Sequence, residues 1–288
     1  MSVPGAMLCA ILACAMAASP ANAGIIFGAT ASGGPGQLYV IDPANGGVLQ
    51  NVGPLNDSLE TNYPITGLAF HPATGVLYGS TGNNPSVTAA RFVTIDPLTA
   101  QVTVIGSFDA GPVNSSGTPA TMTDLAFDAA GNLYGVGSIG GPQLYSINVA
   151  TGKATVIGST DLTSTTGGGL EMIGGVAYGT PTASRFGTYD LVTGAFTNIT
   201  NPIKPGGGGA YAALTADENG VLYGLNSAPG SPPPTFLVTI NPADGAVTNL
   251  GGSVPSLDAI AYIVPEPGAA TVLIVGAAAL ARRARRRI

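Results

Sequence analysis

The stretches ITGLAFHPATGVLYG (65–79) and RFVTIDPLTAQVTVIG (91–106) decide the fold of this chain. Each contains two short apolar runs rich in β-branched and aromatic residues. The runs are separated by clusters of Gly, Pro, Asp and Thr, a pattern typical of strands joined by tight turns. Residues 65–106 therefore predict four short strands in succession.

The same pattern recurs along the chain as three phrases in a fixed order. The first phrase is a strand that ends in LYG or a close variant. The second is a strand that runs into a turn and is followed by a further strand. The third is a strand whose sequence resembles GLAF. Four strands in roughly fifty residues are the period of a propeller blade. The LYG-type strands are 25–28, 76–79, 132–135, 176–179 and 221–224, the strand-and-turn phrases are 38–46, 92–100, 144–152, 186–194 and 236–245, and the GLAF-type strands are 65–70, 122–127, 168–172, 212–216 and 258–262.

The phase of the repeat predicts how the ring closes. The body opens on the LYG-type strand 25–28 and ends on the GLAF-type strand 258–262, so the two incomplete ends together make one blade. We therefore predict an all-β fold, a five-bladed β-propeller of four-stranded blades closed by the C-terminal strand. Such closure leaves no long sheet edge exposed. The alternative, an open solenoid of hairpins, requires capping units, and none is recognisable in the sequence.

The turns sort the loops of such a propeller onto two faces. In IDPANG (41–46), the ring of Pro43 fixes its φ at a value suited to a turn, and the Asp42 carboxylate can accept a hydrogen bond from a following backbone amide. Gly46 tolerates a positive φ. With up-and-down strands, all tight turns of this kind fall on one face. Long loops rich in Gly, Ser, Thr and Pro fall on the opposite face, where we expect binding.

Composition and charge exclude several classes of function. Between Gly24 and Ile263 there are four basic and fourteen acidic residues. A body this acidic, without a basic patch, argues against nucleic-acid binding. The only histidine, His71, occupies a turn position that Asp128 fills in the next repeat, and we interpret it as a turn former. The sequence contains no nucleophile motif, phosphate loop or metal-binding motif, so we predict no catalytic residue, cofactor or metal.

Two carboxylates are candidates for ligand binding. Asp124 and Asp258 begin GLAF-type strands, and we expect both near the mouth of the central channel on the long-loop face, where a cation or a sugar could bind. The favoured hypothesis is a non-enzymatic binding or structural propeller. The alternative is a propeller hydrolase or lyase that uses carboxylates at the channel mouth. The scarcity of His, Lys and Arg in the body favours the first.

The N-terminus has the pattern of a secretory signal peptide. An apolar run from Ala6 to Ala18 is followed by Ala21-Asn22-Ala23, which predicts residues 1–23 as the signal, with cleavage after Ala23. A lipoprotein signal ending at Cys14 is the competing interpretation, but Leu12 fits it poorly. Because Cys9 and Cys14 leave with the signal, the mature chain has no thiol for a disulfide or a metal site.

The C-terminus predicts a membrane stop. Residues 268–281 form an apolar run, and five arginines follow it: Arg282, Arg283, Arg285, Arg286 and Arg287. Fourteen residues make about 21 Å of helix, short for a bilayer core of about 30 Å, but arginine stems can extend the span. The positive-inside rule places the arginines in the cytoplasm, while the signal peptide sends residues 24–263 across.

Residues 264–288 resemble the PEP-CTERM sorting domain, whose signature is Val-Pro-Glu-Pro, an apolar segment and an arginine cluster. Here the signature is Val264, Pro265, Glu266 and Pro267. The resemblance implies processing near this motif by an exosortase, a membrane transpeptidase, in an exopolysaccharide-producing Gram-negative bacterium. It implies transient anchoring in the inner membrane, then a place at the cell surface or in the extracellular matrix, with exopolysaccharide or envelope proteins as partners. The body more loosely resembles bacterial extracellular propellers of unknown function, some of which repeat LYxIDPxTG.

Overall fold

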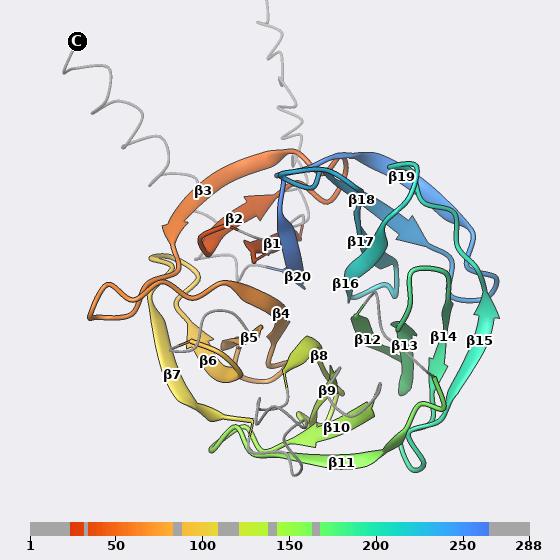
Figure 1. The fold of residues 1–288 in the computed structure, drawn as a ribbon, viewed down its shortest axis with the longest axis horizontal. Coiled ribbons are helices and arrows are strands. Elements are labelled where there is room, and N and C mark those ends of the chain that lie inside the picture. The colour runs from red at the N-terminus through yellow and green to blue at the C-terminus, as the bar shows by residue number, and fades with distance from the viewer. Residues whose placement is uncertain are drawn as a thin grey trace, which may run out of the picture.

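Twenty strands form five four-stranded antiparallel sheets arranged around a central axis (Figure 1). The computed structural model describes residues 24–31, 34–82, 88–108, 121–137, 143–162 and 168–264. Each sheet is one blade of a propeller, with one strand beside the axis and three strands successively further out. The prediction of five blades with four strands each is confirmed.

The blades follow the sequence repeat. In each, the innermost strand is the GLAF-type phrase and the next strand outward is the LYG-type phrase. From the inside outward the strands are β20 (Leu257–Ile263), β1 (Ile25–Thr30), β2 (Gln37–Ile41) and β3 (Val48–Pro54) in blade 1, β4 (Ile65–Phe70), β5 (Leu77–Thr81), β6 (Arg91–Ile95) and β7 (Val102–Ser107) in blade 2, β8 (Met122–Phe127), β9 (Leu133–Gly137), β10 (Gln143–Ile147) and β11 (Ala154–Ser159) in blade 3, β12 (Gly169–Ile173), β13 (Val176–Thr180), β14 (Phe186–Tyr189) and β15 (Phe196–Thr200) in blade 4, and β16 (Ala210–Ala216), β17 (Leu222–Ser227), β18 (Thr235–Ile240) and β19 (Val247–Gly252) in blade 5.

The ring is closed by β20, the last strand of the described chain. It pairs antiparallel with β1, from Ile25 opposite Ile263 to Thr30 opposite Leu257, with one irregularity near Ala29. The innermost strand of blade 1 therefore comes from the C-terminal end of the body and its other strands from the N-terminal end, as the phase of the repeat predicts.

Five separate apolar cores lie between neighbouring blades, and each joins residues of two adjacent sheets. The recurring tyrosines of the LYG phrases belong to four of these contacts. Tyr78 of blade 2 stacks on Phe92 and packs against Phe127 of blade 3, with ring centroids 5.3 and 5.5 Å away. Tyr223 of blade 5 stacks on Tyr262 of blade 1 at 6.0 Å. Burial of these faces between blades supplies most of the apolar stabilisation.

The tight turns are held as the repeated Asp and Asn residues predict. The Asp42 carboxylate accepts from the Ala44 amide at 2.9 Å, and Gly46 has φ of 75°. Its counterpart in blade 2 is Ala100, which holds the same left-handed conformation, φ of 60°, without being glycine. An alanine there costs roughly 1 kcal/mol relative to glycine, so this turn is the strained member of the set.

The segments flanking the propeller, the predicted signal peptide 1–23 and residues 265–288 of the predicted sorting segment, lie outside the described residues. Within the described residues no helix has the length and apolar character needed to span a membrane.

Candidate functional site

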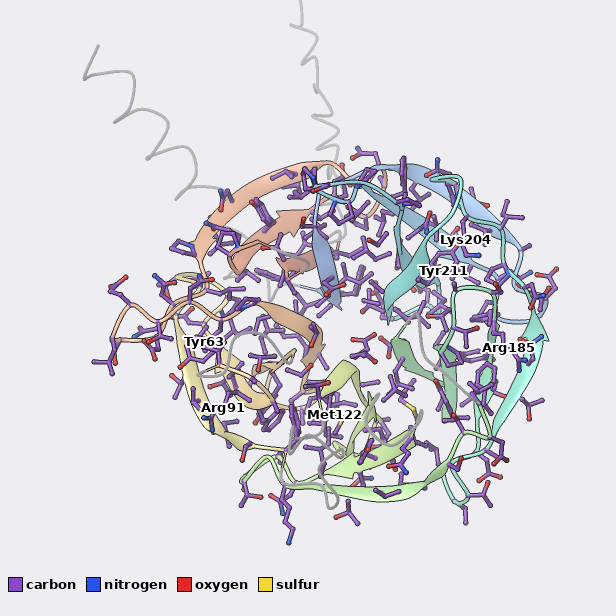
Figure 2. The ribbon with its side chains drawn as sticks, viewed as in Figure 1. Tyr63, Arg91, Met122, Arg185, Lys204 and Tyr211 are labelled. Carbon is purple, nitrogen blue, oxygen red and sulfur yellow. The ribbon has the colours of Figure 1, made fainter. Side chains whose placement is uncertain are left out.

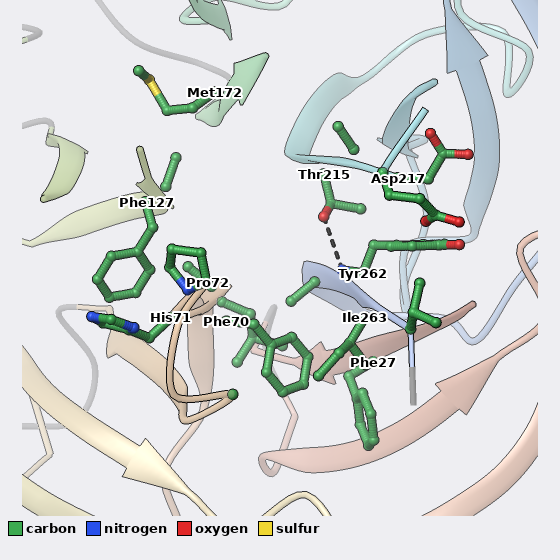
Figure 3. Close-up of a pocket in the computed structure, with 18 of the residues that line it drawn as sticks. Phe27, Phe70, His71, Pro72, Phe127, Met172, Thr215, Asp217, Tyr262 and Ile263 are labelled. Atoms are coloured by element: carbon green, nitrogen blue, oxygen red, sulfur yellow. Dashed lines mark hydrogen bonds between the residues drawn. The ribbon is translucent and has the colours of Figure 1, made fainter. Parts of the chain in front are cut away.

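A pocket of about 740 Å³ opens at the mouth of the central channel. Residues from all five blades line it, because the innermost strands converge there and the turns that follow them form the rim. Figure 3 shows Phe70, Phe127, Met172 and Thr215 on different sides of the opening. Such a concave, largely apolar site with a few polar groups is the usual form of a ligand pocket.

The pocket lies on the tight-turn face of the propeller, not on the long-loop face where we expected binding. It is lined by the turn residues 71–75 and by the ends of β4, β8, β12, β16 and β20. Parts of the long loops, including 83–87, 109–120, 138–142 and 163–167, lie outside the described residues, so the expectation of binding on that face stays a prediction.

Glu171 is one of four carboxylate residues that line the pocket. It lies on β12, partly buried, and its two oxygens accept from the backbone amides of Met172, at 2.6 Å, and Ala216 of blade 5, at 3.1 Å. Burial raises the pKa of Glu171 to about 7, against the opposing effect of these hydrogen bonds. A carboxyl that titrates near neutral pH can accept or release a proton, or meet a cation.

Asp124 lies deeper, with no exposed surface, on the innermost strand of blade 3. One carboxylate oxygen accepts from the Leu125 amide at 2.9 Å. The other accepts from Leu170 of blade 4 at 2.9 Å and from Leu214 of blade 5 at 3.1 Å. Burial raises the pKa of Asp124 well above its usual range, although the three amides oppose the shift, and the charge of Glu171 raises it further.

The three amides that Asp124 binds belong to equivalent positions of three repeats. On an innermost strand, half of the backbone groups face the channel and have no neighbouring strand to bind. Asp124 satisfies three of these groups at once, and so ties blades 3, 4 and 5 together. The other blades leave room for it with small residues at the matching position: Gly67, Gly169, Ala213 and Ala259. A Cβ at Gly67 would lie 2.7 Å from the Asp124 Cα.

Similar bonds join other innermost strands. The Thr215 hydroxyl of blade 5 accepts from the Tyr262 amide of blade 1 at 2.9 Å (Figure 3). The Thr66 hydroxyl of blade 2 donates to the Met122 carbonyl of blade 3 at 2.8 Å. Side chains of one blade thus satisfy the free backbone edge of the next, which fixes the channel wall and the pocket floor.

Three further carboxylates stand at the rim, and each has a local partner. Asp128 accepts from the Ala130 and Asn132 amides, and Asp217 accepts from Asn219 and Val221, so both brace their turns. Glu218 accepts from the Tyr262 hydroxyl, an interaction that, after burial, raises the pKa of Tyr262.

His71 forms the turn between β4 and β5. Its Nδ1 accepts from the Ala73 and Thr74 amides at 3.2 and 3.3 Å, and its ring packs edge-on against Phe127 at 4.9 Å. The structure thus supports the interpretation of His71 as a turn former, although it also lines the pocket.

The residues singled out in the sequence fall in different places. Asp258 lies partly buried near the start of β20 and is not among the residues that line the pocket, while Glu171, the third of the five residues of β12, lines it. Val264, the first residue of the predicted sorting signature, lies at the pocket rim. Outside the described residues lie Ala21, Ala23, Pro265, Glu266, Pro267, Arg282, Arg283, Arg285, Arg286 and Arg287.

Positive charge lies away from the pocket. Figure 2 labels Arg91, Arg185 and Lys204, and all three stand off the central channel in the view down the shortest axis. No lysine or arginine is among the described residues that line the pocket. Nor do the described residues contain a group of three or more His, Cys, Asp or Glu placed to hold a metal ion.

Glu171 is the site residue that the sequence interpretation passed over. The signal was present in the repeat: its position carries Ala69, Ala126, Thr215 and Ala261 in the other four repeats. A carboxylate that interrupts a column of small residues on the innermost strand is a departure that the repeat itself does not require.

Comparisons with known proteins identify a family but no activity. No curated protein matches the chain. A protein of unknown function from Bacteroides caccae aligns with a TM-score of 0.47 and 11% identity over 84% of this chain and 100% of its own. A protein of unknown function from Bacteroides thetaiotaomicron VPI-5482 aligns with a TM-score of 0.45 and 14% identity, over 78% of this chain and 64% of its own. Myxococcus xanthus glutaminyl cyclase aligns with a TM-score of 0.42 and 15% identity, over 68% of this chain and 69% of its own. Because these TM-scores lie below 0.5, none of the three informs the function of this chain.

The family match covers more than half of the chain. Residues 60–231, which run from the loop before β4 to the loop after β17, match a family model described as a repeat of unknown function. The matched span contains all of blades 2, 3 and 4 and part of blade 5. The chain therefore belongs to the DUF6923 family of repeats of unknown function.

Proposed function

We propose that this protein is exported, is held transiently in the inner membrane by its C-terminal segment, and is processed near Val264-Pro265-Glu266-Pro267 by an exosortase-type enzyme. It then serves at the cell surface or in the extracellular matrix as a non-enzymatic propeller that binds its ligand in the channel-mouth pocket. Exopolysaccharide and envelope proteins are the partners that this location offers.

One observation carries the proposal. β1 pairs with β20 so that Ile25 lies opposite Ile263, and both residues line the pocket. The ring is therefore closed between residues 25 and 263, and the ends of β1 and β20 from which the chain continues lie side by side at one face. A signal peptide before Gly24 and an anchor after Val264 can both engage a membrane while the ring stays closed. In the anchored precursor the pocket face is the face nearer to the membrane.

We expect replacement of Arg282, Arg283, Arg285, Arg286 and Arg287 by Ser to release the tail through the membrane. The apolar run 268–281 is short and rich in Ala and Gly, whereas each Arg costs about 2.5–3.5 kcal/mol at the bilayer centre. Mass spectrometry of membrane and secreted fractions should find the variant outside the cell with its tail attached, and the wild type trimmed. A conservative control with five Lys should behave as wild type. Retention and trimming of the Ser variant would contradict the proposed anchor.

A hydrolase or lyase is the second candidate, and Glu171 favours it. Its carboxyl, with a pKa of about 7, stands in a pocket that Asp128, Asp217 and Glu218 also line. A general acid or base works best at a pKa near the working pH. Incubation with a panel of polysaccharides separates the two functions, because a hydrolase or lyase generates new chain ends and a binding protein does not.

A further inference from the structure

The pocket combines negative charge with aromatic walls. Glu171 stands within it, and Asp128, Asp217 and Glu218 stand at its rim. Carboxylates of one sign around a recess with low-dielectric walls focus the field inside it and concentrate ions of the opposite sign. The electrostatics of the pocket therefore favour a positively charged occupant.

The walls suit an organic cation better than a metal ion. The Phe70 ring is only partly buried and packs edge-on against Phe27, with centroids 5.6 Å apart, and the Phe127 ring of the adjacent blade lines the same pocket beside His71 (Figure 3). Aromatic faces attract ammonium groups electrostatically, and they also exclude water from the alkyl carbons of the bound ligand. Metal ions prefer several convergent oxygen or nitrogen ligands, a group that the described residues do not provide.

Glu171 can accept one more partner. Its oxygens take the Met172 and Ala216 amides, and the Thr215 hydroxyl is a third hydrogen-bond partner, whereas two carboxylate oxygens together offer about four acceptor positions. Both amides come from the protein wall, so they hold the carboxylate in place without consuming its charge. A fixed carboxylate and aromatic rings that line one recess form the combination that recognises an alkylammonium group.

We infer that the channel-mouth pocket binds an organic ammonium ion, with Glu171 as its counter-ion and Phe70 as an aromatic wall. The inference deepens the binding role proposed above and rests on it. The ammonium group can belong to a free small molecule or to a deacetylated amino sugar of a polysaccharide, and the experiment below distinguishes these sources.

Binding of such a cation depends on the ionisation of Glu171. Because the pKa of Glu171 is about 7, affinity should fall by about thirtyfold between pH 8 and pH 5.5 as the carboxyl gains its proton. Titratable groups on every neighbouring element line the same recess or lie below it: Asp124 on β8, Asp128 after β8, Asp217 and Glu218 after β16, Tyr262 on β20 and His71 after β4. Asn at position 71 keeps the turn acceptor, so H71N tests the histidine separately.

The experiment is calorimetric titration of the full chain with choline and with its neutral isostere 3,3-dimethylbutan-1-ol. Choline should bind at pH 8, and the isostere at least about tenfold more weakly. E171Q should weaken choline binding by about thirtyfold or more and abolish its pH dependence. E60Q, the same change on the opposite face, should alter neither the affinity for choline nor its pH dependence. F70L should weaken choline binding by about twofold to thirtyfold. H71N should keep the pH profile.

A second pair of ligands identifies the source of the cation. A glucosamine tetramer that binds more tightly than its N-acetylated form at pH 7, where Glu171 is about half ionised and part of the amino-sugar amine is still protonated, indicates a polysaccharide, and choline binding without that preference indicates a free cation. Equal binding of choline and its isostere to the wild type would overturn the inference, whether or not E171Q folds. That failure would leave the export proposal standing, because tail processing is measured independently.

Discussion

Asp124→Ala is expected to destabilise the propeller by about 3–5 kcal/mol, a large part of the stability of an ordinary domain. The substitution leaves three buried amides, those of Leu125, Leu170 and Leu214, without an acceptor. An unsatisfied buried donor costs about 1–3 kcal/mol, and a water that enters the vacated space recovers part of the total. Urea unfolding followed by circular dichroism measures the change.

Asp190→Ala is the matched control for this prediction. The Asp190 carboxylate also accepts from two backbone amides, those of Val192 and Thr193, but at an exposed turn where water replaces it. Its loss should therefore destabilise the propeller far less than the loss of Asp124. Equal losses for the two alanine variants would show that Asp124 is an ordinary turn-like acceptor and not the residue that ties three blades together.

Removal of β20 is expected to abolish cooperative unfolding of the propeller. A chain that ends at Pro255 loses the ladder with β1 and four buried side chains, Leu257, Ala259, Ile260 and Ala261, which belong to two inter-blade cores. Burial of Leu and Ile alone is worth about 1.5–3 kcal/mol each, and the exposed edge of β1 invites aggregation. Differential scanning calorimetry should find no transition like that of the intact protein.

A chain that ends at Val264 is the control, because it keeps β20 and loses only the sorting segment. Its melting temperature should match that of the longer chain. If the chain ending at Pro255 melted at the same temperature as this control, closure of the ring by β20 would contribute nothing to stability, and the role assigned to that strand would be wrong.

Much of the fold is predictable from the sequence because the repeat marks strand order and turn position. The phase of the phrases identifies β20 as the partner of β1 across almost the whole chain, and the Asp and Asn turns lie where the pattern places them. Ala100 shows the limit of the pattern: it adopts a left-handed conformation at a position where glycine stands in other repeats.

The pocket was less accessible to prediction because it depends on how five strands converge. The repeat shows that Asp124 begins an innermost strand, but not that its carboxylate reaches the amides of two other blades. It shows Glu171 as an irregular residue, but not that burial raises its pKa to about 7. Loop length directed the expectation of binding toward the long-loop face, whereas the pocket is built from short turns and strand ends.

The pairing of the Glu171 carboxylate with a bound ammonium ion is measured most directly by ¹³C NMR of glutamate carboxyl carbons. The chain has four glutamates, at 60, 171, 218 and 266, and the resonance missing from E171Q identifies Glu171. In the free protein it should titrate with a midpoint near 7, and saturating choline should lower that midpoint by about one pH unit or more. A midpoint that does not move while choline is bound would show that the cation lies elsewhere.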